Sequence, residues 1–379
     1  MAYANFRTTQ YVLGNGSLEK LSELKEKKIA LVVDEFIVKA LGLDKSLYEG
    51  ILAGAEFKVI CSMSKEPTME LLDAPIRAMQ EYAPDYIVGI GGGSVMDTAK
   101  ALWLFYELPH YDWDKAMVPY AVESFPGKAQ LIVVPTTSGT GSETTGCAVI
   151  KDYEKRKKMI LSNEIVPTLA ILDYALLKSL PPKNIAFSGT DALAHALEAA
   201  VSRISNKMVE LEGIQAAVTL IRELPGSQRG ETTAREKVHV AASLAGQAIN
   251  NAITGMAHGM DQAGGDFGLP HGLLTGMLLP YTMRYLMPQP IYVQVAEQLG
   301  LTGSDEEKQN GLVEAIWKMY DEIGMPKTLK AVGVPEAEYL EKIASYVPYA
   351  LADANIQLCP KDPTAQQLEE LYRQFYYGL

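Results

Sequence analysis

Two polar side chains, Asp191 and His195, stand four residues apart in the apolar stretch DALAH, residues 191–195. On a helix this spacing places both on one face, so a carboxylate and an imidazole can act on the same ligand. The pair alone is a common pattern, and on a surface it is only a capping contact. It indicates a metal site only if further ligands converge on it.

The chain has five histidines, and two of the others occur in settings that suit a ligand. His258 lies in GMAHGMD, toward the expected end of a long helix rich in Ala and Gly, and His271 follows Pro270 at an expected helix start. One aspartate and three histidines form a mixed oxygen and nitrogen set that suits Zn²⁺ or Fe²⁺. Each histidine taken singly is more often an ordinary helix residue, but together they favour a metal site.

Two loops rich in glycine and hydroxyl groups each follow a predicted strand. GIGGGSVMDTAK, residues 89–100, opens a helix, and its glycines let backbone N–H groups approach a pyrophosphate. Ser94 replaces the last glycine of the usual G-x-G-x-x-G fingerprint. PTTSGTGSETT, residues 135–145, adds the hydroxyl groups of Thr136, Thr137, Ser138 and Thr140. Because open α/β sheets bind ligands at their carboxyl edge, the two loops together predict a dinucleotide site.

Asp34 ends the first predicted strand, where acidic residues of dinucleotide folds accept hydrogen bonds from the adenosine ribose. A strand-ending turn aspartate is an equally strong interpretation. If Asp34 faces the ribose, its charge repels a 2′-phosphate, so the residue favours NAD(H), with NADP as the alternative.

Short apolar runs alternate with helical patterns up to about residue 180, as in a parallel sheet wrapped by helices. Strand signals stop beyond Pro181, and the pattern becomes helical and rich in small residues. We therefore expect an α/β, Rossmann-like domain over 1–180 and an all-α domain over 181–379. The expected strands are 29–33, 57–60, 85–90, 130–135 and 169–173, with shorter β pieces in CAVI and KMILS; the expected helices include 36–52, 68–82, 189–203, 206–223, 233–262 and 271–286, with a polar loop at 226–236.

Composition narrows the classes of function. A length of 379 residues suggests two domains, and 48% apolar with 21% charged residues is ordinary for a soluble globular protein. The net charge of −12 argues against nucleic acid as a partner. The first residues, MAYANFRTTQ, lack the pattern of a secretory signal, and no apolar run is long enough to span a membrane. Three scattered cysteines do not form a disulfide framework, so we expect a cytoplasmic protein.

Five motifs in order, GGGSVMDTAK, PTTSGTGSE, GTDALAHALEA, HGMDQAGGDFGLPHG and LLPYTMRYL, resemble the signatures of the iron-containing (group III) alcohol dehydrogenases. The resemblance covers essentially the whole chain. It implies a dehydroquinate synthase-like architecture, with a dinucleotide-binding domain, a helical domain and a divalent metal in the cleft between them. Domain closure would then bring the nicotinamide to the metal and exclude water. It also suggests a homodimer or a larger homo-oligomer.

The resemblance assigns residues to both parts of the site. The metal-binding and catalytic positions are Asp191, His195, His258 and His271. The positions on the cofactor side are Asp34, Gly92, Gly93, Ser94, Asp97, Thr136, Thr137, Thr140 and Lys158. Without the resemblance, Lys158 in EKRKKMI would be interpreted as one charge in a solvated basic run.

One position departs from the family pattern. Many relatives carry a further histidine four residues after the third ligand, where this chain has Gln262, and the segment to the last ligand is one residue shorter. Glutamine does not gain or lose a proton in the working pH range, so it does not relay a proton at this position. His271 and bound water are the remaining conduits.

The expected activity is metal-dependent hydride transfer between NAD(H) and a small primary alcohol or its aldehyde, with Fe²⁺ or Zn²⁺ as Lewis acid. A glycerol dehydrogenase or a semialdehyde-reducing 4-hydroxybutyrate dehydrogenase is the alternative within this chemistry. More remote alternatives are a dehydroquinate synthase-like lyase and a non-catalytic metal-binding protein. The residues that could line a substrate pocket, although each is more often packing, are Phe105, Tyr106, His110, Trp113 and Phe267.

Overall fold

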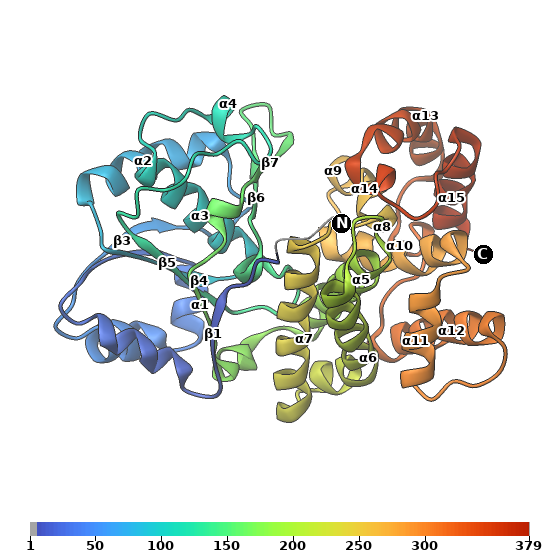
Figure 1. Cartoon of the computed structure of the whole chain (residues 1–379), viewed down its shortest axis with the longest axis horizontal. Coiled ribbons are helices and arrows are strands. Elements are labelled where there is room, and N and C mark those ends of the chain that lie inside the picture. Colours follow the sequence, from blue (N-terminus) through green and yellow to red (C-terminus); the bar gives the residue numbers. More distant parts are fainter. Residues whose placement is uncertain (1–5, 379) are drawn as a thin grey trace. The chain divides into compact units, whose positions relative to one another are not determined.

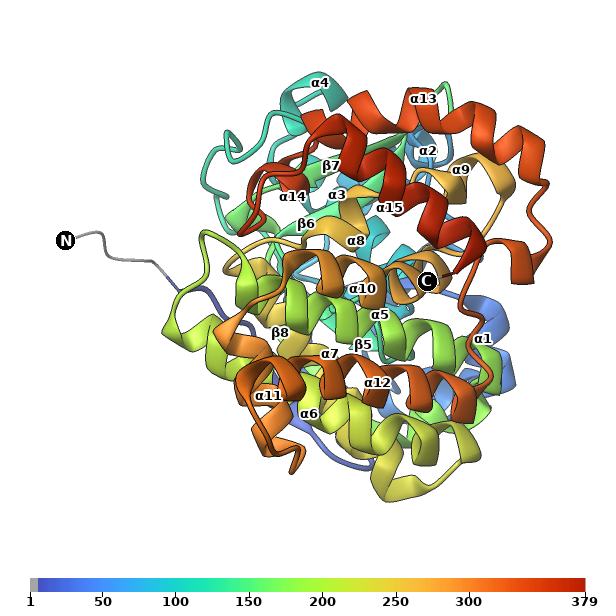
Figure 2. The same cartoon turned by 90° about the vertical axis from the view of Figure 1, so that its right-hand side faces the viewer.

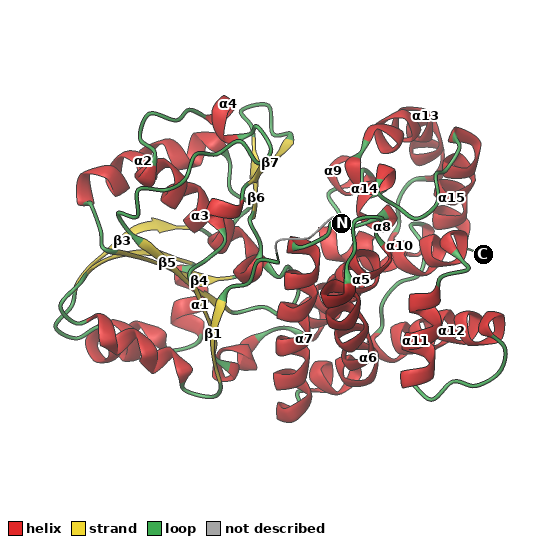
Figure 3. Cartoon of the chain, viewed as in Figure 1, coloured by secondary structure: helices red, strands yellow, loops and turns green. Residues whose placement is uncertain are grey.

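The computed structural model describes residues 6–378 and divides them into two compact units, one from Phe6 to Leu180 and one that begins at Pro181 (Figure 1). Figure 3 shows the described strands in the first unit, whereas the second is built from helices. The predicted fold class, an α/β part followed by an all-α part, is confirmed. No helix among the described residues is both long and apolar enough to cross a membrane.

Six parallel strands form the main sheet of residues 6–180. The apolar runs predicted as strands are all present, and the sheet also has an edge strand, β1, that we did not predict. In sheet order the strands are β1 (Gln10–Leu13), β8 (Leu169–Leu172), β5 (Gln130–Pro135), β4 (Tyr86–Gly91), β2 (Lys28–Val33) and β3 (Glu56–Ser62).

Side chains of β2 alternate between two apolar layers, one on each face of the sheet. Ile29 and Leu31 pack with η1 (Ser17–Leu24) and η2 (Asp44–Ile51). Ala30 and Val32 pack with α2 (Met69–Tyr82) and α3 (Gly93–Glu107) on the other face. Because both faces are covered, the central strands are continuous apolar runs, which is why the sequence reveals them.

The helix expected over 36–52 is two helices, because Gly42 adopts a φ of 65° and ends the first of them. An antiparallel hairpin follows the second glycine loop, and it contains the β pieces predicted from CAVI and KMILS. The remaining elements are α1 (Glu35–Ala40), α4 (Trp113–Ala116), η3 (Ser142–Thr144), β6 (Cys147–Lys151), β7 (Lys157–Leu161), η4 (Asn163–Ile165) and η5 (Tyr174–Ser179).

The second unit is a helical bundle in which α5 (Pro182–Val201) packs against α6, α7 and α10 (Figure 2). Every residue from Gly189 to Val201 is buried, so the apolar texture around Asp191 and His195 reflects a helix surrounded by others. The other helices are α6 (Lys207–Arg229), α7 (Thr232–Asn250), α8 (Met256–Gly259), α9 (Ala263–Phe267), α10 (His271–Leu286), α11 (Pro290–Gln298), α12 (Asp305–Ile323), η6 (Lys330–Val332), α13 (Glu336–Ala352), α14 (Ala354–Gln357) and α15 (Ala365–Tyr377).

Two predictions for this bundle are wrong. The expected polar loop at 226–236 is mostly helix, since only two residues separate α6 from α7. Gly226 and Ser227 are buried in the last turn of α6, so packing favours helix there. The expected helix over 233–262 ends at Asn250, so His258 lies on the separate short helix α8.

Candidate metal centre and nucleotide loops

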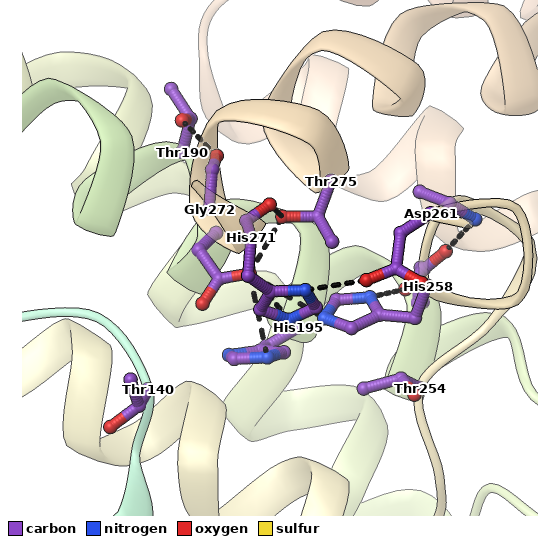
Figure 4. Close-up of polar contacts among 12 residues, drawn as sticks. Thr140, Thr190, His195, Thr254, His258, Asp261, His271, Gly272 and Thr275 are labelled. Atoms are coloured by element: carbon purple, nitrogen blue, oxygen red, sulfur yellow. Dashed lines mark hydrogen bonds and ion pairs between the residues drawn. The ribbon is translucent and has the colours of Figure 1, made fainter. Parts of the chain in front are cut away.

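Four side chains meet in the helical unit around one carboxylate oxygen, Oδ1 of Asp191. The distances from this oxygen are 3.8 Å to Nε2 of His195, 3.5 Å to Nε2 of His258 and 3.7 Å to Nε2 of His271. Figure 4 shows the three imidazole rings gathered at this point, one from each of α5, α8 and α10. The structure therefore brings together all four residues that the sequence selected as ligands.

The four ligands differ in exposure. The side chains of Asp191, His195 and His258 are almost completely buried, and their ligand atoms lie within 4.8 Å of one another. The side chain of His271 is 38% exposed and lies at the open side of the group. The most accessible of the four ligands is therefore the one at the start of α10.

The arrangement fits a divalent metal ion. In a tetrahedral site with bonds of about 2.1 Å, neighbouring ligand atoms lie about 3.4 Å apart. The measured separations of 3.5–3.8 Å from Asp191 Oδ1 are close to this value. Nε2 of His258 is buried and, among the described residues, has no hydrogen-bond partner. A cation at the centre would satisfy it, and the three nitrogens and one oxygen suit Fe²⁺ or Zn²⁺.

Close packing of α10 on α5 places His271 beside Asp191. A Cβ atom added to Gly272 would lie 2.6 Å from the backbone oxygen of Phe187, and one added to Gly276 would lie 2.3 Å from Oγ1 of Thr190. Only glycine permits this approach of the two helix backbones. Thr190 Oγ1 also donates to the carbonyl of Gly272 at 3.4 Å, as Figure 4 shows.

Three polar side chains that we did not predict surround the ligands. Glu198 accepts from Nδ1 of His258 at 2.5 Å, Asp261 lies 2.7 Å from Nδ1 of His271, and Thr275 donates to Asp191 Oδ1 at 2.7 Å. Glu198 could have been found, since it stands three residues after His195 and seven after Asp191 on the same helix face.

Burial and the charges of the neighbouring side chains shift the pKa values of the ligands. Burial would raise the pKa of Asp191, but the surrounding histidines, led by His195, outweigh it and hold the pKa well below its usual range. Burial lowers the pKa of His195 to about 4 despite Asp191. For His258 burial is opposed by Glu198 and Asp191, which raise the pKa to about 10. The carboxylates therefore favour positive charge at this centre, whether proton or metal.

The two glycine loops meet at the carboxyl edge of the sheet in the α/β unit. Gly91 of β4 is in register with Pro135 of β5, where the loops begin. A Cβ on Gly93 would lie 2.9 Å from Thr140, and one on Gly92 would lie 3.4 Å from Thr137. Helix α3 begins at Gly93, beside this contact, and no side chain of the described residues caps its N-terminus. Its N–H groups suit an anion.

Asp34 stands at the same edge, since its N–H donates to the carbonyl of Ile90 on β4. Its carboxylate oxygen Oδ1 caps α1 by accepting from the N–H groups of Phe36 and Ile37 at 3.0 and 3.2 Å. One carboxylate oxygen of Asp34 therefore has the turn role that we considered. The contact with a ribose remains a prediction.

Asp97 and Lys158, also expected on the cofactor side, have different settings. Asp97 accepts from the hydroxyl of Ser142 at 2.7 Å and from the N–H of Val149 at 3.0 Å, so its carboxylate ties α3 to the second loop. The fully buried Lys100 beside it donates to Ser142 at 2.8 Å. Lys158 is exposed on β7.

The ring-bearing candidates for a substrate pocket make contacts within their own units, and among them the side chain of His110 is exposed. Phe105 is 4% exposed and meets Trp113 edge to face at 4.6 Å between ring centres. Tyr106 donates to the carbonyl of Pro84, His110 lies 3.7 Å from Glu123, and Phe267 packs near Tyr339.

Comparisons with known proteins find matches over almost the whole chain. Residues 8–174 match the family "Iron-containing alcohol dehydrogenase", and residues 185–376 match "Fe-containing alcohol dehydrogenase family, C-terminal". The chain is 34% identical to an NADPH-dependent butanol dehydrogenase of Clostridium saccharobutylicum, with 96% of each chain covered. It is 32% identical to the 1-propanol dehydrogenase PduQ of Citrobacter freundii, with 96% of this chain and 97% of that protein covered. A solved iron-containing alcohol dehydrogenase from Thermococcus thioreducens superposes with a TM-score of 0.89 at 31% identity over the full length of both chains.

Proposed function

This chain belongs to the iron-containing alcohol dehydrogenase family, a family of metal-dependent oxidoreductases, and we propose that it interconverts a small primary alcohol and its aldehyde. The names of two relatives, a butanol dehydrogenase and a 1-propanol dehydrogenase, support a short unbranched substrate. The sequence has no cluster of arginines that would favour a phosphorylated substrate.

Asp191, His195, His258 and His271 are the residues to which we assign the metal, Fe²⁺ or Zn²⁺. When bound, such an ion supplies Lewis acidity that polarises a carbonyl oxygen and stabilises an alkoxide. The three imidazoles present Nε2 to one carboxylate oxygen, and burial of three of the four side chains limits water at the ion. This convergence is the single observation that carries the proposal.

The nucleotide is assigned to the α/β unit. The uncapped N-terminus of α3 and the hydroxyl groups of the second loop suit the pyrophosphate, with Gly92, Gly93 and Ser94 on one side and Thr136, Thr137 and Thr140 on the other. Asp97 holds the second loop in place, and Lys158 is proposed to approach the cofactor from β7.

We propose NAD(H) as the preferred nucleotide, because the oxygen of Asp34 that does not cap α1 would accept from a ribose hydroxyl and repel a 2′-phosphate. The name of the butanol dehydrogenase, which is NADPH-dependent, favours the alternative nucleotide, NADP(H). A kcat/KM for NADPH equal to or above that for NADH would reject this preference.

The test of the activity is elemental analysis of anaerobically purified protein together with NADH oxidation across short aldehydes, diols and acidic semialdehydes. We expect about one Fe²⁺ or Zn²⁺ per chain and one NADH consumed per aldehyde. Catalytic NAD without net consumption would support the lyase alternative, and metal binding without turnover the non-catalytic one. We also propose a cytoplasmic homodimer or larger homo-oligomer, to be checked by light scattering.

A further inference from the structure

We propose that Glu198 and Asp261 are positioning residues that fix the tautomers of His258 and His271, so that each presents the lone pair of Nε2 to the metal. This inference rests on the metal site proposed above. It concerns how the ligand histidines are oriented, and it assigns a role to two carboxylates outside the ligand set.

Glu198 holds the buried side of the site. Its side chain is 4% exposed, and its two oxygens accept separately from the backbone N–H of Ala257 and from Nδ1 of His258, both at 2.5 Å. A carboxylate can only accept, so Nδ1 of His258 must carry the proton. One side chain on α5 thus sets both the position of α8 and the orientation of its histidine.

Asp261 holds the open side. Its Oδ2 lies 2.7 Å from Nδ1 of His271, and the two side chains are 20% and 38% exposed. By the same argument the proton of His271 lies on Nδ1 and its Nε2 lone pair faces Asp191. Figure 4 shows Asp261 and the ring of His271 joined in this way.

The two fixed tautomers produce an arrangement in which a metal ion or a further proton must lie between Nε2 and Asp191. The Nε2 atoms of His258 and His271 lie 3.5 and 3.7 Å from the same oxygen of Asp191. In the neutral Nδ1–H tautomer, each of these contacts joins two acceptors and is repulsive unless a cation lies between them. His195 differs, because its buried Nδ1 has no hydrogen-bond partner among the described residues. Its ring belongs to the buried helix α5 and stacks on the ring of His258, with 4.7 Å between ring centres.

A direct test is the tautomer of each histidine in the zinc-loaded protein. The chain has five histidines, so ¹⁵N-histidine labelling gives few signals to assign. We expect His258 and His271 to carry the proton on Nδ1, with Nε2 bound to zinc. Coordination through Nδ1 in either residue would overturn the inference, and this readout needs no variant that must fold.

A second test uses chelator competition to measure zinc affinity. Asp261→Ala should bind zinc about 10- to 100-fold more weakly than wild type. Asp261→Asn, whose amide oxygen still accepts from Nδ1, should recover most of that loss. The matched control is Asp266→Asn, because Asp266 accepts from Tyr346 at 2.6 Å outside the site and its change should leave zinc affinity unaltered.

The outcomes separate this inference from the proposed function. If wild type fails to bind zinc, or if His258→Ala binds it as tightly as wild type, the metal site itself is wrong. If wild type binds zinc, His258→Ala does not, and Asp261→Ala equals wild type, the positioning role of Asp261 is wrong while the metal site stands.

Discussion

Replacing Gly272 by alanine is expected to move His271 away from the metal centre. The added Cβ would lie 2.6 Å from the backbone oxygen of Phe187 and 3.2 Å from Cβ of Asp191, whereas ordinary contacts begin at 3.4 Å. The nearest atom belongs to the backbone of α5 and cannot rotate away. Helix α10 must therefore retreat from α5 by about 0.8 Å, the difference between 3.4 and 2.6 Å.

The size of this displacement sets the expected effects. Overpacking of this kind costs about 1–3 kcal/mol of folding free energy. For a protein unit of roughly 200 residues each kcal/mol lowers Tm by about 2–4 °C, so Tm should fall by several degrees. Metal sites require ligand distances within about 0.2 Å, and a shift of about 0.8 Å exceeds this tolerance. Metal affinity should therefore fall at least about tenfold.

Calorimetry and chelator competition measure the two effects on the same preparation. Gly265→Ala is the matched control, because an added Cβ there has no atom within 4 Å and the residue lies in the nearby helix α9. It should leave metal affinity unchanged and Tm equal or slightly higher. A Gly272→Ala protein with the Tm and metal affinity of wild type would refute the argument that glycine at this contact sets the position of His271.

His258→Ala should lose the metal and turnover but keep NADH affinity in a fluorescence titration, because the nucleotide loops belong to residues 6–180; retained turnover would remove His258 from the site. Asp34→Ser should raise the ratio of kcat/KM for NADPH to that for NADH at least about tenfold with little change in Tm, since serine also caps a helix; an unchanged ratio would show that Asp34 does not face the ribose. Burial lowers the pKa of His239 to about 4, so the unfolded chain takes up its proton first as the pH falls below 6.5. The free energy of unfolding that His239 contributes above pH 6.5 is thus lost toward pH 4, by about 3 kcal/mol. In urea unfolding, the free energy of unfolding of His239→Gln should therefore depend less on pH than that of wild type. An identical pH dependence in both proteins would contradict this.

The strands and the two loops could be predicted because their signals are local. A strand buried on both faces is an unbroken apolar run, and a glycine turn before a helix is visible in the sequence itself. Strand β1 gave no such signal, because its four residues are partly exposed at the sheet edge. The helix that carries DALAH was predicted from the helical pattern of small and apolar residues over 189–203, and the spacing of Asp191 and His195 then places both on one face.

Predictions failed where tertiary packing decides the outcome. The polar residues of GSQRGETTARE favour a loop. In the structure Gly226 packs closely against Glu231 and Ala234, and most of the segment is helical. The contact of Asp261 with His271 joins residues that are ten positions apart, with helix α9 between them. Neither periodicity nor composition carries information about such a contact.

Gln262 shows how the structure changes the meaning of a departure from a family pattern. In the sequence it is only the loss of a histidine. In the structure its amide nitrogen donates to the carbonyl of Gly259 at 2.7 Å, and its amide oxygen accepts from the hydroxyl of Tyr372 at 2.5 Å. Both polar ends are therefore used to tie the segment after α8 to α15. The amide supplies the donor and the acceptor from one terminal group, without any change of protonation state. The glutamine thus stabilises the segment that positions a ligand.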